Sequence, residues 1–71
     1  MLRTNLKKYR EQKGISQTEA GKLVKVSRQT ISSIERGEYN PSIILVLKLA
    51  ELFNTRVEDI FWLEENEYER D

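Results

Sequence analysis

The feature that most constrains the fold is a pair of serines, each placed to cap a short helix. Ser16 is followed three residues later by Glu19, which matches the capping box, in which each side chain accepts a hydrogen bond from the other residue's backbone N–H. Ser27 is the second cap. The expected helices cover residues 16–24 and 27–36, and the few residues between them give the spacing of a helix-turn-helix.

The second of these helices has the composition of a polar binding surface. Its sequence, SRQTISSIERG, is rich in short polar side chains that are mediocre helix formers. Only Ile31 and Ile34 are apolar, and their spacing gives one narrow stripe toward the core. The opposite face carries Arg28, Gln29, Ser32, Ser33 and Arg36. Arg can pair with guanine and Gln with adenine in the major groove, and short hydroxyls allow a close approach, so this face suits DNA.

Charge is segregated along the chain although the formal net charge is zero. Residues 1–37 carry nine Lys and Arg side chains against three acids, a net charge of +6, whereas residues 38–71 carry three against nine, a net charge of −6. This asymmetry indicates a basic binding face and an acidic remainder. The alternative is that these charges are solvated faces segregated by chance.

Three further helices complete an all-α prediction of five helices. The first covers about residues 5–13, with Thr4 or Asn5 as its N-cap, and the last two cover about 43–53 and 57–61. In the fourth helix one stripe is expected to face the core: Ile43, Val46, Leu49, Ala50 and Phe53. The second helix continues through Ala20 and Leu23 to about Val24.

The chain is short enough to make one domain, expected over residues 1–66. Residues 1–4 and 62–66 could each form a short edge strand. Residues 67–71 are expected to be a frayed acidic tail.

Several function classes are disfavoured by composition. The chain has no cysteine and no histidine, which removes disulfides, zinc fingers, thiol nucleophiles and imidazole bases. No glycine-rich phosphate loop or spaced carboxylate pair stands out, so we expect no enzyme activity, no cofactor and no metal. No apolar run approaches a membrane helix, the first residues lack a signal-peptide core, and no small-molecule pocket is suggested.

The segment ISQTEAGKLVKVSRQTISSIERGEYNPS resembles the helix-turn-helix of the phage-repressor/Cro (Xre) superfamily over roughly residues 5–61. The motif positions matched are Ser16, Gln17, Gly21, Val26, Ser27, Ile31, Glu35 and Gly37. The resemblance implies a sequence-specific, DNA-binding transcriptional regulator in the cytoplasm, at the prokaryotic nucleoid. Whole-chain features suggest the small stand-alone subgroup, which implies a homodimeric repressor on a near-palindromic operator.

The resemblance also implies roles for individual residues. Base reading falls to Arg28, Gln29, Ser33 and Ser27. Backbone or supporting contacts fall to Gln17, Ser16, Thr30, Ser32, Arg36 and Asn40. Arg10 is expected to pair with Glu35 in a structural ion pair, since an inward Glu35 without a partner would be costly. The alternative for Gln17 is an exposed glutamine at a helix start, and the alternative for the pair is a solvated Glu35 with a frayed Arg10.

Two positions depart from the family pattern. Lys25 stands in the turn where glycine is usual and must either adopt a positive φ or avoid that geometry. Gly21 stands where alanine is usual, which weakens the second helix slightly but lets the third pack close.

The C-terminal third is more apolar than a small core requires. Ile44 and Leu47 lie off the core stripe of the fourth helix, and Ile60-Phe61-Trp62-Leu63 follows. Such surplus marks interfaces, so we expect a dimer interface containing Ile44, Leu47, Ile60, Trp62 and Leu63. The alternative is that Trp62 and Leu63 fold back on the first helix.

One rival function is a binding module of the same fold, such as an antitoxin that clasps a toxin protein or a factor that bridges other proteins. The chain lacks a long extra segment with which to wrap a toxin, which disfavours this interpretation.

Overall fold

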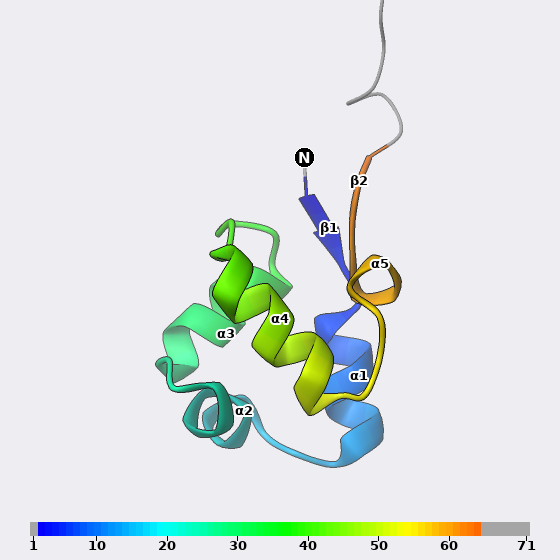
Figure 1. The fold of residues 1–71 in the computed structure, drawn as a ribbon. Helices are drawn as coiled ribbons and strands as arrows, with labels where there is room; N and C mark the ends of the chain where they lie inside the picture. Colours follow the sequence, from blue (N-terminus) through cyan, green and yellow to red (C-terminus); the bar gives the residue numbers. More distant parts are fainter. Residues whose placement is uncertain (1, 65–71) are drawn as a thin grey trace, which may run out of the picture.

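The computed structural model describes residues 2–64, which form five helices and two short strands (Figure 1). In chain order these are β1 (Leu2–Thr4), α1 (Leu6–Lys13), α2 (Gln17–Val24), α3 (Arg28–Glu35), α4 (Ile43–Leu52), α5 (Val57–Ile60) and β2 (Phe61–Leu63). The five-helix prediction is confirmed, with boundaries within one residue of those expected. The predicted acidic tail at 67–71 and the end of the predicted 62–66 strand lie outside the described residues.

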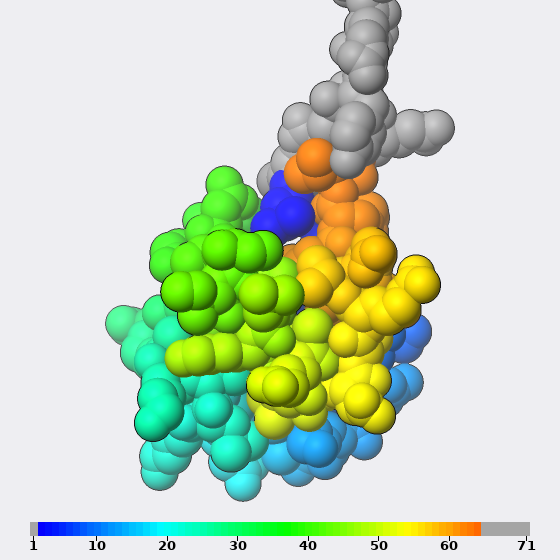
Figure 2. Space-filling model, viewed as in Figure 1, coloured from blue at the N-terminus to red at the C-terminus, as the bar shows by residue number. Residues whose placement is uncertain are grey.

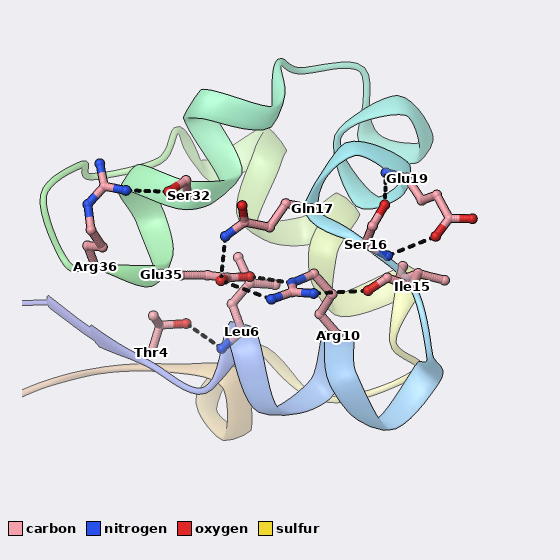
Figure 3. A network of polar contacts seen from close by, with 10 residues as sticks. All are labelled: Thr4, Leu6, Arg10, Ile15, Ser16, Gln17, Glu19, Ser32, Glu35 and Arg36. Atoms are coloured by element: carbon pink, nitrogen blue, oxygen red, sulfur yellow. Dashed lines mark hydrogen bonds and ion pairs between the residues drawn. The ribbon is translucent and has the colours of Figure 1, made fainter.

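Three of the helices have a serine as their N-cap. In the capping box of α2, the Glu19 backbone N–H donates to Ser16 Oγ at 3.0 Å and the Ser16 N–H donates to Glu19 Oε1 at 2.8 Å (Figure 3). Ser27 Oγ accepts from the backbone of α3, and Ser42 Oγ does the same for α4, each at 3.1 Å. Each such cap stabilises its helix by about 1 kcal/mol.

The start of α1 is tied to the end of α5. The Ile60 carbonyl oxygen accepts from the Asn5 backbone N–H at 2.9 Å and from Thr4 Oγ1 at 2.8 Å. Thr4 Oγ1 also accepts from the Leu6 N–H at 3.0 Å, which satisfies one free donor of the first helical turn. Asn5 occupies the N-cap position but makes no side-chain cap bond.

β1 and β2 pair in an antiparallel, two-stranded sheet that joins the two ends of the domain. Leu2 lies opposite Leu63, and Thr4 lies opposite Phe61. The terminal strands expected from the sequence are therefore present, although β2 begins at Phe61 rather than at 62. Figure 1 shows the sheet projecting beyond the helices, next to α5.

The core draws on every helix. Its largest fully buried side chains are Leu6, Ile31, Ile34, Leu49 and Ile60. Ala20 and Val24 of α2 and Leu45 and Val46 of α4 complete it.

One residue predicted to face the core, Ile43, is instead exposed, and so is the apolar Leu23 of α2. Ile43 is 67% exposed and Leu23 is 57% exposed. Ile43 is the first residue of α4 and shares a side of that helix with the buried Ala50, so its exposure comes from its position in the first turn and not from the rotation of the helix. In α2, burial of Ala20 and Val24 turns Leu23 outward.

Candidate nucleic-acid interface

The connection between α2 and α3 fixes the position of the helix that we expect to read DNA. Lys25 takes the left-handed conformation, with φ of 66°, in the place where the family usually has glycine. The Val26 N–H donates to the Gly21 carbonyl at 2.8 Å. A Cβ added to Gly21 would lie 2.6 Å from the Val26 carbonyl oxygen, so a larger residue there would force this connection to shift.

The outward face of α3 forms a concave polar surface. Its lining residues are Arg28, Gln29, Ser32, Ser33 and Arg36. Arg28, Gln29 and Arg36 are exposed, whereas the two serines between them are half-buried. The helix thus brings two cationic side chains, one amide and two hydroxyls to one surface, with its apolar residues Ile31 and Ile34 buried on the other side.

Two residues expected at the DNA surface serve the start of α3. Ser27 Oγ accepts the Thr30 N–H, and the two hydroxyl oxygens lie 3.1 Å apart. Ser27 is exposed and Thr30 is half-buried. Ser16 holds the equivalent position in the capping box of α2. Ser16 and Ser27 therefore define where α2 and α3 begin.

Arg10 and Glu35 form a bidentate ion pair between α1 and α3. Arg10 Nε donates to Glu35 Oε2 at 2.6 Å and Nη2 donates to Oε1 at 3.3 Å. The two side chains are 11% and 5% exposed. Arg10 Nη1 donates to the Ile15 carbonyl at 3.0 Å. The hydrogen bond to Glu35 raises the pKa of Arg10 above its ordinary value, against the opposing effect of burial.

Gln17, for which we predict a contact to DNA, lies against this pair in the DNA-free structure. Figure 3 shows its side chain directed at Glu35, and Nε2 donates to Oε1 at 3.0 Å. The residue is half-buried. In residues 2–64, every buried side-chain nitrogen or oxygen has a hydrogen-bond partner. This second partner of Glu35 could not be predicted from the local sequence pattern, because the two residues are eighteen positions apart.

Arg36 lies back over the polar face. It donates to Ser32 Oγ through Nη1, to Ser33 Oγ through Nη2 at 3.4 Å, and Nη2 lies 3.1 Å from Glu38 Oε1. Asn40 is exposed in the segment that follows. Glu38 was not among the predicted site residues, although it places a carboxylate beside the basic face. Its position two residues after Arg36 was the only feature of the sequence that suggested a contact between them.

A second surface is apolar. Ile44 is 64% exposed and Leu47 is 54% exposed on α4, next to Ile43. Trp62 and Leu63 of β2 are 41% and 42% exposed, which argues against their folding back on α1. Figure 2 shows α4 (green) lying across the face in view, with α5 (yellow) and β2 (orange) beside it.

Ile60 does not belong to that surface. We predicted it in the dimer interface, but its side chain is fully buried in the core. The short α5 turns the Ile60 side chain into the core, while its carbonyl receives the bonds from Thr4 and Asn5. Phe61, which follows it, is buried as well.

Within the described residues, no helix is long and apolar enough to cross a membrane. The same part of the chain contains no cluster of acidic residues suited to hold a metal ion.

Comparison with known proteins gives a consistent result. The family model described as helix-turn-helix matches residues 6–60. The chain is 44% identical over 64 residues to the uncharacterized HTH-type transcriptional regulator YgzD of Bacillus subtilis, covering 90% of this chain and 97% of that protein. It is 42% identical over 66 residues to an uncharacterized HTH-type transcriptional regulator of Archaeoglobus fulgidus, covering 93% and 94%.

Among solved structures, the fold matches that of the restriction-modification controller protein C.AhdI from Aeromonas hydrophila. The TM-score is 0.70 at 31% sequence identity, and the match covers 76% of this chain and 78% of that one. The family match covers the part of the chain that contains the capped α2–α3 pair, the buried stripe of α3 and its polar outer face. The chain belongs to the helix-turn-helix family of DNA-binding transcriptional regulators, in its repressor/Cro-like (Xre) branch.

Proposed function

We propose that this protein binds a near-palindromic operator as a homodimer and represses transcription by occupying it. The observation that carries the proposal is the concave polar face of α3, lined by Arg28, Gln29, Ser32, Ser33 and Arg36. Occupancy alone excludes polymerase, so the mechanism needs no catalytic group. The site of action is the cytoplasm, at the nucleoid.

The affinity of this complex comes from charge and its specificity from α3. The first 37 residues carry a net charge of +6, and neutralising phosphates releases counterions from the duplex. Arg28 and Gln29 are exposed at the N-terminal end of α3, the part of a recognition helix that reaches base edges. In the major groove these side chains can make bidentate contacts to guanine and adenine respectively.

The homodimer forms through the apolar surface, defined here as Ile43, Ile44, Leu47, Trp62 and Leu63. These side chains are between 41% and 67% exposed in the single chain. Exposed apolar side chains of this kind favour association, and a two-fold interface uses the same surface on both copies. Ile60 has no part in it, since it is fully buried.

The similarity to a restriction-modification controller protein and to HTH-type transcriptional regulators supports a regulatory role. A two-fold dimer would present both copies of α3 to one face of the duplex, with half-sites about 34 Å apart. That geometry requires an operator with inverted half-sites.

Selection of bound duplexes from a random pool, read by sequencing, tests this proposal. The enriched sequence should contain two inverted half-sites with centres about one helical turn apart. A control duplex with the same half-sites moved apart by five base pairs should bind far more weakly, because the second copy of α3 would face away. Enrichment of no motif would reject sequence-specific binding, and a single non-repeated motif would reject the dimeric operator. With the selected site placed across a promoter, transcription in vitro should fall as protein is added; an increase would reject repression.

A further inference from the structure

We infer that Arg36 reads a base in the major groove and that Ser32 and Ser33 are the residues that position it. The inference deepens the proposed function and rests on it. It differs from the expectation drawn from the family resemblance, in which Arg36 makes a supporting contact to the DNA backbone.

The backbone places Arg36 on the same row as the other polar side chains. It is the C-cap of α3 and keeps right-handed helical geometry, with φ of −84° and ψ of −3°. Ser32 and Ser33 are therefore four and three residues before it, on the neighbouring turn of one helix face. Long side chains on a helix lie back toward its N-terminus, over that turn. The Arg36 side chain follows this rule: it bonds Ser32, as Figure 3 shows, and also reaches Ser33 Oγ.

The hydroxyls fix the direction of the guanidinium group. Ser32 Oγ accepts from Nη1 and Ser33 Oγ accepts from Nη2, so both terminal nitrogens are held over the polar face. A residue that binds phosphate would extend from the end of the helix toward the rim of the groove. Here the planar group instead lies within the concave surface that also contains Arg28 and Gln29. An arginine fork in that place can address guanine O6 and N7.

In the absence of DNA, the guanidinium group of Arg36 is paired with the Glu38 carboxylate. Its carboxylate lies 3.1 Å from Nη2, and both side chains are more than half exposed. An exposed pair of this kind is weak and is easily exchanged for another partner. Approach of the phosphate backbone repels the carboxylate, which frees Nη2 while the two serines keep the group in place. A guanidinium group has five N–H donors, enough to keep both serine bonds and still reach a base.

Arg36 would read a base pair separate from the one read by Arg28. Eight positions along a helix correspond to about 12 Å of rise. That distance is about three base-pair steps, at roughly 3.4 Å each. Each half-site should therefore contain a distinct position whose identity depends on Arg36.

The test repeats the random-pool selection with variants of the full chain. Arg36→Lys keeps the charge but loses the planar fork, so preference at one base pair per half-site should relax by about 5- to 100-fold. Preference at the remaining positions should persist. The Ser32→Ala, Ser33→Ala double variant should relax the same position and leave that of Arg28 intact, an effect that a merely structural role would not produce. Arg56→Lys, at the start of α5, is the matched control and should change no preference.

Two results would overturn the inference. One is an Arg36→Lys protein that selects the same site with unchanged preference. The other is an Arg36→Ala protein that binds all sequences more weakly by one factor, with the salt slope reduced by about one, as for a phosphate contact. If the wild-type protein enriches no site, the proposed function fails and this inference fails with it. If the wild-type site depends on Arg28 and Gln29 but on neither Arg36 nor the serines, this inference alone is wrong. Circular dichroism of each variant identifies any that fail to fold. Because the Arg36 side chain is exposed, Arg36→Lys should fold, and its base preference then decides whether Arg36 reads a base.

Discussion

Arg10 Nε lies 2.6 Å from Glu35 Oε2, and this contact joins the first helix to the helix that carries the polar face. With Gln17 and the Ile15 carbonyl it forms a small network in which no described buried polar atom lacks a partner. The network therefore holds α3 at a fixed angle to the rest of the domain.

Glu35→Gln should lower the free energy of unfolding by about 3 kcal/mol, because it leaves the nearly buried Arg10 without its counter-charge. Urea unfolding followed by circular dichroism measures this. The control is Glu64→Gln, which breaks the exposed Arg3–Glu64 pair and should cost less than about 1 kcal/mol. A loss of only a few tenths for Glu35→Gln would mean that the pair behaves as a surface contact.

Arg28→Ala and Gln29→Ala should each weaken operator binding by about 1–3 kcal/mol and relax preference at one position per half-site. Lys8→Ala, on α1, should instead weaken binding to all sequences alike. Titration of labelled duplexes at several salt concentrations separates the two effects. If the Arg28→Ala, Gln29→Ala double variant bound the selected site as tightly as the wild type, the assignment of α3 as the reading helix would be wrong.

Gly21→Ala should destabilise the domain even though alanine is the better helix former. The new Cβ would lie 2.6 Å from the Val26 carbonyl oxygen, so the connection to α3 must shift. We expect a loss of about 1–3 kcal/mol in thermal or urea unfolding, with weaker operator binding. Lys22→Ala, at an exposed position of the same helix, is the control and should leave stability within about 0.5 kcal/mol. Unchanged stability in Gly21→Ala would show that the connection has room to move.

Sedimentation at micromolar protein should give twice the chain mass of 8.4 kDa. Ile44→Glu and Trp62→Ala should each shift the protein toward monomer and weaken operator binding without altering base preference. The matched control is Leu23→Glu, since Leu23 is 57% exposed on α2 but lies outside the proposed interface. A mass near that of the single chain in the wild type would contradict a preformed dimer. Retention of the dimer in both variants would place the interface elsewhere.

The fold was predictable to the extent that local signals define it. Ser16 with Glu19, Ser27 and Gly37 mark helix ends by hydrogen-bonding and φ preferences that act within a few residues. The core face of α4 was predictable only in part. Val46, Leu49 and Ala50 of the predicted stripe are buried, but apolar residues surround that helix, so its pattern did not show that Leu45 would be buried and Ile43 exposed.

The polar face of α3 could also be located from the sequence, because one helix of known phase brings its members together. The partners of those residues could not. Gln17 and Glu35 meet only because α2 and α3 cross, and Glu38 reaches Arg36 only through the conformation of the chain after Gly37. Ile60 was misplaced because an apolar run gives no sign of which residue enters the core.

The pairing of β1 with β2 has a consequence for protein synthesis. The sheet joins residue 2 to residue 63, so a nascent chain can close it only after almost the entire domain has left the ribosome. The α2–α3 pair spans about twenty residues and can form much earlier, since short loops close at lower entropic cost. The α2–α3 pair is therefore available to form before the terminal sheet, and α1 can gain the Thr4 and Asn5 bonds to Ile60 only after residue 60 has been synthesised.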